Sequence, residues 1–417
     1  MSGEALAIWL NDLRVAVVER ERRGRLRLSY TDEAFSSFQG GVPLLSLDLP
    51  LTRERYPNAR TRAFLEGLLP EGEPRLAIAA DLDLQASDVF GLLAALGRDC
   101  AGALVIQPAG DPPPATPTTA SAAPIRPDEL AQLVGNLRSA PLGVGRRVRL
   151  SLAGVQEKLL LTRMPDGGWG RPVEGAPSTH ILKPEIARYR HTVENEAFCM
   201  GIARHLGLEV ANVDVARVEE RPVLVVERYD RLVENNGAVR RVHQEDLCQA
   251  LGLSPAHKYE EDSGPTLARV AEVLRDFAEP TAIEALLRAV TLNVAIGNCD
   301  AHGKNFSLLH TDSGGLRLAP LYDLMATRLY PVDDHLAMYV DTVQRADRVT
   351  AERLVNEAAG WGMRRQRAEE IVGDLLERLP AALVAAAEET TDAPADLVAL
   401  VGSRVDRLLD SRAPGGA

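Results

Sequence analysis

Apolar and polar residues alternate over the first part of the chain, and this pattern predicts β-strands. Residues 7–10 are followed by a turn at Asn11-Asp12 and by strand patterns over 14–18 and 25–30, which together predict a small antiparallel sheet. Helical patterns come next at 60–69 and 73–80. Asp88 can cap a third helix, which ends near Gly97, and residues 104–106 are predicted to form a closing strand. We therefore expect residues 1–107 to form a strand-rich N-terminal subdomain.

The pattern changes twice further along the chain. Residues 108–127 are rich in Pro, Ala and Thr, a composition that cannot bury a core and that predicts a flexible linker. Residues 128–242 are rich in strand patterns, with helical patterns at 128–138 and 192–206; the strand patterns are 148–152, 157–164, 179–183, 214–218 and 222–228. Residues 243–417 are mainly helical, with helical spacing at 267–277, 282–296 and 351–379, and the evident strands there are a hairpin around Gly314.

Composition and charge narrow the class of protein. The 417 residues are 46 % hydrophobic and 25 % charged, as in a globular protein, and the net charge of −12 makes the chain a poor candidate for wrapping nucleic acid on its own. The four cysteines are far apart in the sequence, which argues against a zinc site or a disulfide framework and suits a reducing cytoplasm. Neither a signal peptide nor a membrane span is evident, so we expect a cytoplasmic protein.

One short run carries the strongest chemical signal. Asp300 precedes Asn305 by five residues, the spacing of a protein-kinase catalytic loop, in which the Asp takes a hydroxyl proton and the Asn holds Mg²⁺. The hairpin pattern after Asn305 ends at Tyr322-Asp323 and would return a second carboxylate to this loop. Two carboxylates and a carboxamide are hard oxygen ligands, so the sequence predicts a magnesium–phosphate site.

Other segments supply the remaining parts of a phosphotransfer site. Lys183 ends a strand pattern before Pro184, which we expect to stop the ladder, and it can reach phosphates as a point charge. Glu194 and Glu196 in the next helix are both candidates for the carboxylate that orients Lys183. The loop 151–158 can turn its N–H groups toward phosphate, and 222–231 can serve as an adenine-binding hinge.

Two further side chains of the Asp300 loop have possible roles. His302 lacks partners at metal-ligand spacing, so we favour a bracing or phosphate-facing role. Lys304 is placed to stabilise the charge on a transferring phosphoryl group. A strand-rich portion followed by a helical portion that carries these groups predicts an α+β, bilobal protein-kinase-like fold.

Several longer motifs, in order, resemble the HipA family of serine/threonine kinases, the toxins of HipBA-type toxin–antitoxin modules. They extend over nearly the whole chain: 68–72, 90–103, 151–158, 194–196, 226–231, 243–252, 300–305 and 322–323. The resemblance implies an ATP- and Mg²⁺-dependent protein kinase with Asp300 as catalytic base and with Asn305 and Asp323 as magnesium ligands. It implies that ATP contacts a set of residues from both portions: Ala153, Gly154, Val155, Gln156, Glu157, Lys158, Lys183, Glu227, Arg228, Tyr229, His302, Gly303, Lys304, Asn305, Tyr322 and Asp323.

The resemblance also implies regulation and partners. Ser151 matches the serine that family members autophosphorylate, and a phosphate beside the ATP site would act as an off switch. The implied partners are a HipB-like helix-turn-helix antitoxin, operator DNA contacted mainly through it, and a protein substrate such as an aminoacyl-tRNA synthetase, the glutamate enzyme first. Two alternatives stay open: a catalytically silent antitoxin-binding co-repressor, and a kinase for a small molecule or lipid.

Overall fold

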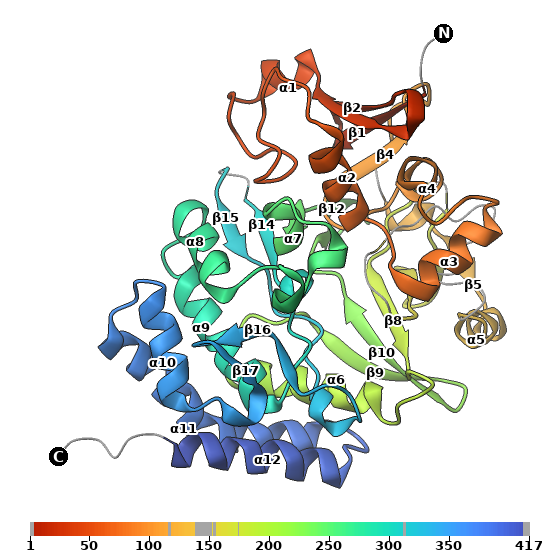
Figure 1. Cartoon of the computed structure of the whole chain (residues 1–417). Coiled ribbons are helices and arrows are strands. Elements are labelled where there is room, and N and C mark those ends of the chain that lie inside the picture. Colours follow the sequence, from red (N-terminus) through yellow and green to blue (C-terminus); the bar gives the residue numbers. More distant parts are fainter. Residues whose placement is uncertain are drawn as a thin grey trace. The chain divides into compact units, whose positions relative to one another are not determined.

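The computed structural model describes residues 4–115, 118–137, 152, 156–173, 175–311 and 314–411 (Figure 1). The chain divides into two compact units, each made of two separate stretches. The first unit comprises Met1–Pro184 and Ala216–Pro255, and the second comprises Glu185–Val215 and Ala256–Ala417. No helix in the described ranges is both long enough and apolar enough to cross a membrane.

The first unit begins with the antiparallel sheet that the alternating pattern predicts. Strands β1 (Ala5–Leu10), β2 (Leu13–Arg20) and β3 (Leu26–Tyr30) are consecutive hairpins, and β4 (Leu104–Pro108) pairs with the other edge of β1. The sheet order is therefore β3-β2-β1-β4. Asn11 adopts a φ of 53° in the β1–β2 turn, a left-handed conformation that Asn tolerates better than most residues.

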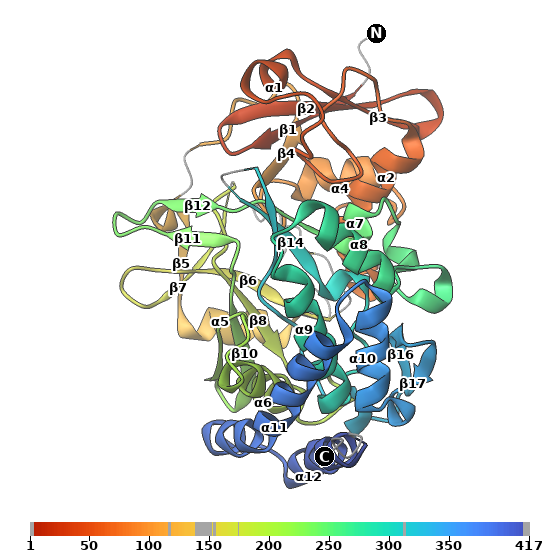
Figure 2. The ribbon, with the colours of Figure 1, turned by 90° about the vertical axis from the view of Figure 1, so that its left-hand side faces the viewer.

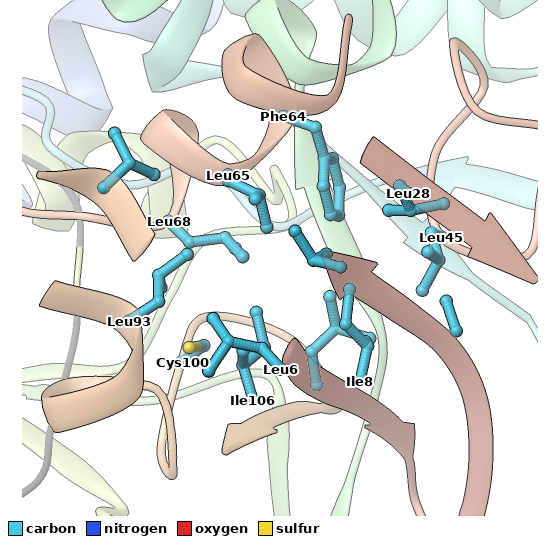
Figure 3. Packing of buried hydrophobic residues seen from close by; sticks show 14 of the residues in the cluster. Leu6, Ile8, Leu28, Leu45, Phe64, Leu65, Leu68, Leu93, Cys100 and Ile106 are labelled. Atoms are coloured by element: carbon cyan, nitrogen blue, oxygen red, sulfur yellow. The ribbon is translucent and has the colours of Figure 1, made fainter. Parts of the chain in front are cut away.

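Helices cover this sheet and build its core. They are α1 (Asp32–Ser37), α2 (Asn58–Gly67), α3 (Gly72–Asp81) and α4 (Val89–Leu96). Asp88 caps α4 as predicted, because its carboxylate accepts the N–H of Gly91 at 3.0 Å. Figure 3 shows Leu6 and Ile8 of β1 facing the same apolar cluster as Phe64 of α2 and Leu93 of α4.

The second sheet of the first unit contains β5 (Ala123–Ile125), β6 (Leu159–Arg163), β7 (Trp169–Arg171), β8 (His180–Pro184) and β10 (Arg221–Glu227). Their order is β5-β7-β6-β8-β10, and each of these neighbouring pairs is antiparallel. Strand β8 ends at Pro184, one residue later than the predicted end at Lys183, and Pro184 still lies opposite Val223 in the ladder. Strand β5 lies inside the segment 108–127, for which the composition predicted no element.

Shorter elements complete this unit. Helix α5 (Pro127–Gly135) begins with Pro at its first position, where the missing N–H costs nothing. Strands β11 (Arg231–Val233) and β12 (Val239–Arg241) form a hairpin (Figure 2). After β13 (Gln244–Asp246), Asp246 and Gln249 form a capping box on α7 (Leu247–Ala250). Strand β9 (Val213–Val218) carries the chain back to the first unit.

The second unit is mainly helical. Its helices are α6 (Thr192–His205), α8 (Leu267–Phe277), α9 (Ala282–Ile296), α10 (Ala351–Gly360), α11 (Arg365–Glu389) and α12 (Ala395–Asp410). Helix α11 packs against α6, α9, α10 and α12, so it is the central helix of this unit (Figure 1). The sequence predicted one helix over 351–379, but the structure has two, because the chain turns after α10 at Gly362, whose φ is 87°.

Two hairpins complete the second unit. Strands β14 (Ser307–His310) and β15 (Leu316–Leu318) form the predicted hairpin, with Leu308 opposite Leu318. Strands β16 (His335–Val340) and β17 (Val343–Arg345) form another. The expectation that the Gly314 hairpin held the evident strands after residue 243 was therefore wrong.

Candidate active site

The site begins where α9 ends. Gly297 closes the helix in the left-handed conformation, with a φ of 75°, and a Cβ there would lie 2.9 Å from Nε of Arg404. The Arg404 guanidinium comes from α12, is buried, and donates to the carbonyl of Val294 at 2.6 Å. A cation that binds the last carbonyls of a helix stabilises its C-terminus, so α12 helps to fix the point from which the next loop departs.

Asparagine side chains then set the path of the loop. Asn298 donates from Nδ2 to Oδ1 of Asn293 at 2.8 Å and accepts the N–H of Asp300 on its own Oδ1 at 3.1 Å. The carbonyl of Asp300 accepts the N–H of His302 at 2.8 Å. On the other side, the Cys299 carbonyl accepts the N–H of Ala337 in β16 at 2.9 Å. The backbone that carries Asp300 is thus held by α9 and by a strand.

The hairpin β14–β15 brings Asp323 back to this loop, as predicted. Asn305 donates from Nδ2 to Oδ2 of Asp323 at 3.3 Å. The hydroxyl of Tyr322 donates to the carbonyl of Lys304 at 2.6 Å and lies 2.7 Å from the hydroxyl of Ser307. Asp323 adopts a φ of 58°, an uncommon conformation for a residue other than Gly and one that is concentrated at functional sites.

The side chains of the Asp300 loop differ in their exposure to solvent. Asp300 is exposed, whereas His302, Lys304 and Asn305 are each 8 % exposed. Burial, with help from the charge of Lys258, lowers the pKa of His302 to about 3, so its imidazole is neutral at physiological pH. A histidine of such low basicity is a poor general base.

A tyrosine that sequence reasoning missed contacts the same loop. The hydroxyl of Tyr259 donates to Oδ1 of Asp300 at 2.8 Å, although 41 positions separate the two residues. No spacing rule links them, and a lone tyrosine near a 3-10 helix carries no signal in the sequence. The contact is visible only once the fold is known.

The other predicted residues of the second unit lie on α6. Glu194 is 6 % exposed, and its Oε2 has no hydrogen-bond partner among the described residues. That oxygen lies 3.8 Å from Nδ1 of His191, and Glu185 offers a third ligand-type atom nearby. Glu196 is 2 % exposed. Both glutamates are therefore buried on α6.

The nucleotide-binding residues predicted before residue 243 belong to the first unit. Lys183 lies in β8 opposite Leu224 of β10. Gln156 and Glu157 are half-buried and Lys158 is buried. Ser151, Ala153, Gly154 and Val155 lie outside the described residues.

Residues 228–231, the part of the predicted hinge that follows β10 and is called the hinge segment below, are held by a buried ion network. Arg228 donates from its N–H to the carbonyl of Thr179 at 2.9 Å, and its guanidinium binds Asp230 at 2.9 Å and the carbonyl of Cys100 at 2.9 Å. Arg231 binds Asp99 at 2.9 Å. Because Asp99 and Cys100 lie in the connection between α4 and β4, the network joins the N-terminal subdomain to the hinge segment within one unit.

The charges of this network compensate one another. Burial alone would raise the pKa of Asp99, but the guanidiniums of Arg231, Arg228 and Arg241 hold it below its usual value. Asp230 is likewise held in its charged form, since its pKa is lowered despite burial by Arg228 and Arg231. Next to it, the hydroxyl of Tyr229 donates to Gln244 at 2.5 Å. The backbone between Glu227 and Tyr229 is thereby fixed.

The fold and the loop geometry define an α+β protein of the kinase-like class. Residues 6–107 match the HipA N-terminal domain, and residues 150–383 match the HipA-like C-terminal domain. The chain therefore belongs to the HipA family, as its motifs indicated, and the predicted fold class is confirmed.

Individual relatives agree with this assignment. The chain is 40 % identical over 372 residues to a Sinorhizobium fredii protein named "Putative kinase Y4mE", covering 87 % of this chain and 85 % of that protein. It is 33 % identical over 361 residues to the serine/threonine-protein kinase toxin HipA of Shewanella oneidensis, covering 83 % and 81 %. A chain in the solved Shewanella oneidensis complex of HipA, HipB and operator DNA matches with a TM-score of 0.83 and 30 % identity, over 97 % of this chain and 96 % of that chain.

Proposed function

We propose that this protein is an ATP- and magnesium-dependent serine/threonine-protein kinase and the toxin of a toxin–antitoxin module. The observation that carries the proposal is the convergence of a loop and a hairpin, which brings Nδ2 of Asn305 within 3.3 Å of Oδ2 of Asp323. The relatives named as kinases support the reaction class.

Asn305 and Asp323 fit a magnesium ion. Mg²⁺ is bound by hard oxygen donors and keeps part of its water, and a carboxylate beside a carboxamide offers such oxygens. The amide that now donates to Asp323 would turn its oxygen toward the ion. When bound, the ion would neutralise charge on the phosphates.

Asp300 is the proposed catalytic base. The acceptor hydroxyl would lose its proton to the Asp300 carboxylate as its oxygen bonds to the γ-phosphorus and the bond to the ADP oxygen breaks. Lys304 would stabilise the charge on the transferring group. An exposed carboxylate on a firmly held backbone suits this role, because the base must be accessible and also positioned.

Nucleotide binding is proposed for the residues that the family resemblance implies. Lys183, Lys158 and the neighbouring loop residues would bind phosphates, and Glu227 and Tyr229 would contact adenine. Arg228, whose guanidinium is committed to Asp230 and Cys100, would hold this segment in place. His302, Gly303 and Tyr322 would line the nucleotide site, with a neutral imidazole at His302.

Ser151 is the proposed autophosphorylation site. A phosphate there would add about −1.5 to −2 charges at neutral pH beside the phosphate-binding residues and would repel nucleotide. Modification would thus switch the kinase off.

The proposed partners follow from the family. A HipB-like antitoxin would bind this chain and contact operator DNA, which suits a protein whose own net charge is −12. The proposed substrate is an aminoacyl-tRNA synthetase, the glutamate enzyme first, so that phosphorylation would slow translation. The support for the antitoxin and for operator DNA is the relative solved with HipB and operator DNA, and the synthetase is proposed from the family resemblance.

The test is intact mass after incubation with ATP and Mg²⁺. We expect the wild type to gain one phosphate, about 80 Da, and Asp300→Asn to gain none, because it lacks the base. Ser151→Ala should also gain none while still phosphorylating a purified synthetase.

Three results would count against the proposal. Equal mass gain by the wild type and Asp300→Asn would remove Asp300 from catalysis. Nucleotide binding without phosphate transfer to Ser151 or to any synthetase would favour the silent co-repressor, and transfer to small molecules or lipids alone would favour the other alternative.

A further inference from the structure

The segment that carries Tyr259 is anchored on both sides, to the catalytic loop before Tyr259 and to β16 after it. The N–H of Gly303 in the loop donates to the carbonyl of Lys258 at 3.0 Å. On the other side, the N–H of Tyr339 in β16 donates to Oε2 of Glu260 at 2.7 Å. The residue between these two anchors is therefore held in place by its neighbours on both sides.

The Tyr259 ring is also fixed by packing. It meets the His302 imidazole edge to face, with centroids 5.2 Å apart and planes at 82°, an arrangement that aromatic pairs prefer. The ammonium of Lys258 lies 5.6 Å from the centre of the Tyr259 ring. Because ring and backbone are both restrained, the hydroxyl has a defined position, 2.8 Å from Oδ1 of Asp300.

This contact restrains the side-chain torsion of Asp300 that has the broader energy profile, the rotation about its last bond. The Asn298 and His302 bonds fix the main chain of Asp300, but rotation of a carboxylate about its last side-chain bond has a broad energy profile. A hydrogen bond to one carboxylate oxygen selects an orientation. Since a carboxylate has about four acceptor sites, a bond to Oδ1 does not exhaust its capacity to accept an alcohol proton.

We propose that Tyr259 is a positioning residue, whose hydroxyl holds the Asp300 carboxylate in the orientation that accepts the proton of a serine or threonine hydroxyl. This inference rests on the proposed function, since it assumes that Asp300 is the base. In this role Tyr259 acts through Asp300 and not through the acceptor or the phosphate. Misorientation of a catalytic group slows the chemical step and leaves ground-state binding intact.

The first experiment separates chemistry from binding. The rate of autophosphorylation is followed by intact mass at a series of ATP concentrations with Mg²⁺, on the full chain. We expect Tyr259→Phe to lower the rate at saturating ATP about tenfold and to leave the half-saturating ATP concentration within about twofold. The matched control is Tyr339→Phe, which removes a hydroxyl from the strand that anchors the same segment and should change neither value.

A double-mutant cycle shows whether Tyr259 acts through Asp300. In an Asp300→Ala background, Tyr259→Phe should change the residual rate by less than about twofold, because the group on which it acts is gone. The same cycle is measured without nucleotide by urea unfolding. There the double variant should shift the midpoint by less than the sum of the two single shifts, as expected of two groups that interact.

Each outcome has a distinct meaning. A Tyr259→Phe rate equal to that of the wild type overturns the inference, and a higher rate would mean that the hydroxyl competes with the acceptor. Additive effects in both cycles also overturn it.

If Asp300→Ala keeps the full rate, the proposed function itself fails. Loss of activity in Asp300→Ala with full activity in Tyr259→Phe removes the inference alone. Should the wild type gain no phosphate, the unfolding cycle still decides whether the two groups are coupled.

Discussion

Glu245 is a carboxylate that the fold buries almost completely, in the first unit. Both of its oxygens accept the N–H of Leu47, at 3.1 and 3.2 Å. Burial, partly offset by Ser46, His243 and this N–H, raises the pKa of Glu245 to about 7. The folded protein therefore holds a proton on Glu245 at pH values where the unfolded chain, in which a glutamate has its ordinary pKa of 4.5, has lost it.

This difference makes stability depend on pH. Between about pH 4.5 and pH 7 the folded state binds more protons at this site than the unfolded state, so the contribution of Glu245 to stability falls as pH rises. The loss should be roughly 3 kcal/mol and should be complete above pH 7. We expect Glu245→Gln, which stays neutral, to flatten the curve and to be more stable than the wild type at pH 8.

Urea unfolding from pH 4.5 to 8 measures the effect. The control is Glu73→Gln, at an exposed position at the start of α3, which should leave the shape of the curve unchanged. A Glu245→Gln curve parallel to that of the wild type would contradict the expected titration.

At the scale of the elements, the stability of the connection between α4 and the hinge segment depends on buried ion pairs. Replacing Arg228 with Met leaves Asp230 with the Arg231 guanidinium and with two neutral donors, Gly102 and Gln244, and removes the donors to Ser178 and Cys100. Removing one partner of a buried ion pair costs about 3–5 kcal/mol, because the remaining charge stays buried. We expect Arg228→Met to destabilise the first unit by this amount, measured by urea unfolding.

A surface pair provides the comparison. Arg126 and Asp128 form an exposed ion pair at the start of α5, with an Nε–Oδ1 distance of 3.1 Å. Exposed pairs contribute little, so Arg126→Met should leave the unfolding midpoint nearly unchanged. Equal effects of the two substitutions would show that the buried network is not coupled to folding.

Elements defined by local patterns were predictable from the sequence. The helical spacing over 267–277 and 282–296 matches the bounds of α8 and α9, and alternation located the N-terminal sheet. Strand β5 was not predicted, because its pairing with β7 joins distant parts of the chain. The break between α10 and α11 was missed since apolar spacing continues across Gly362 and a single Gly is tolerated in a helix.

In the candidate site, too, some residues were predictable from local patterns and others were not. Asp300 and Asn305 follow a spacing rule with a chemical reason, Asp323 was predicted from the hairpin pattern after them, and the structure brings Asn305 and Asp323 together. Tyr259 and the Asp99–Arg231 ion pair depend on contacts across 41 and 132 positions, which no local pattern encodes. Their roles follow from tertiary structure alone.

At the scale of the whole molecule, residues 1–107 are part of the first unit rather than an appendage. Their apolar cluster includes Leu160, and Asp99 compensates buried arginines that follow β10. We expect a chain that begins at residue 108 to lose the cooperative unfolding of the first unit, because this apolar face and Arg231 would be left uncovered. Circular dichroism and limited proteolysis measure the loss, and a truncated chain with the native thermal transition would contradict it.

Helix α12, whose Arg404 anchors the end of α9, is synthesised well after α9. The carbonyl of Val294 precedes its partner Arg404 by 110 positions. At the usual translation rate, about 5 to 20 seconds pass between these two residues. During that interval a nascent chain already contains Asp300 and Asn305 but lacks the arginine that caps the helix before them. The loop that carries Asp300 and Asn305 would thus reach its finished form only after α12 has been synthesised.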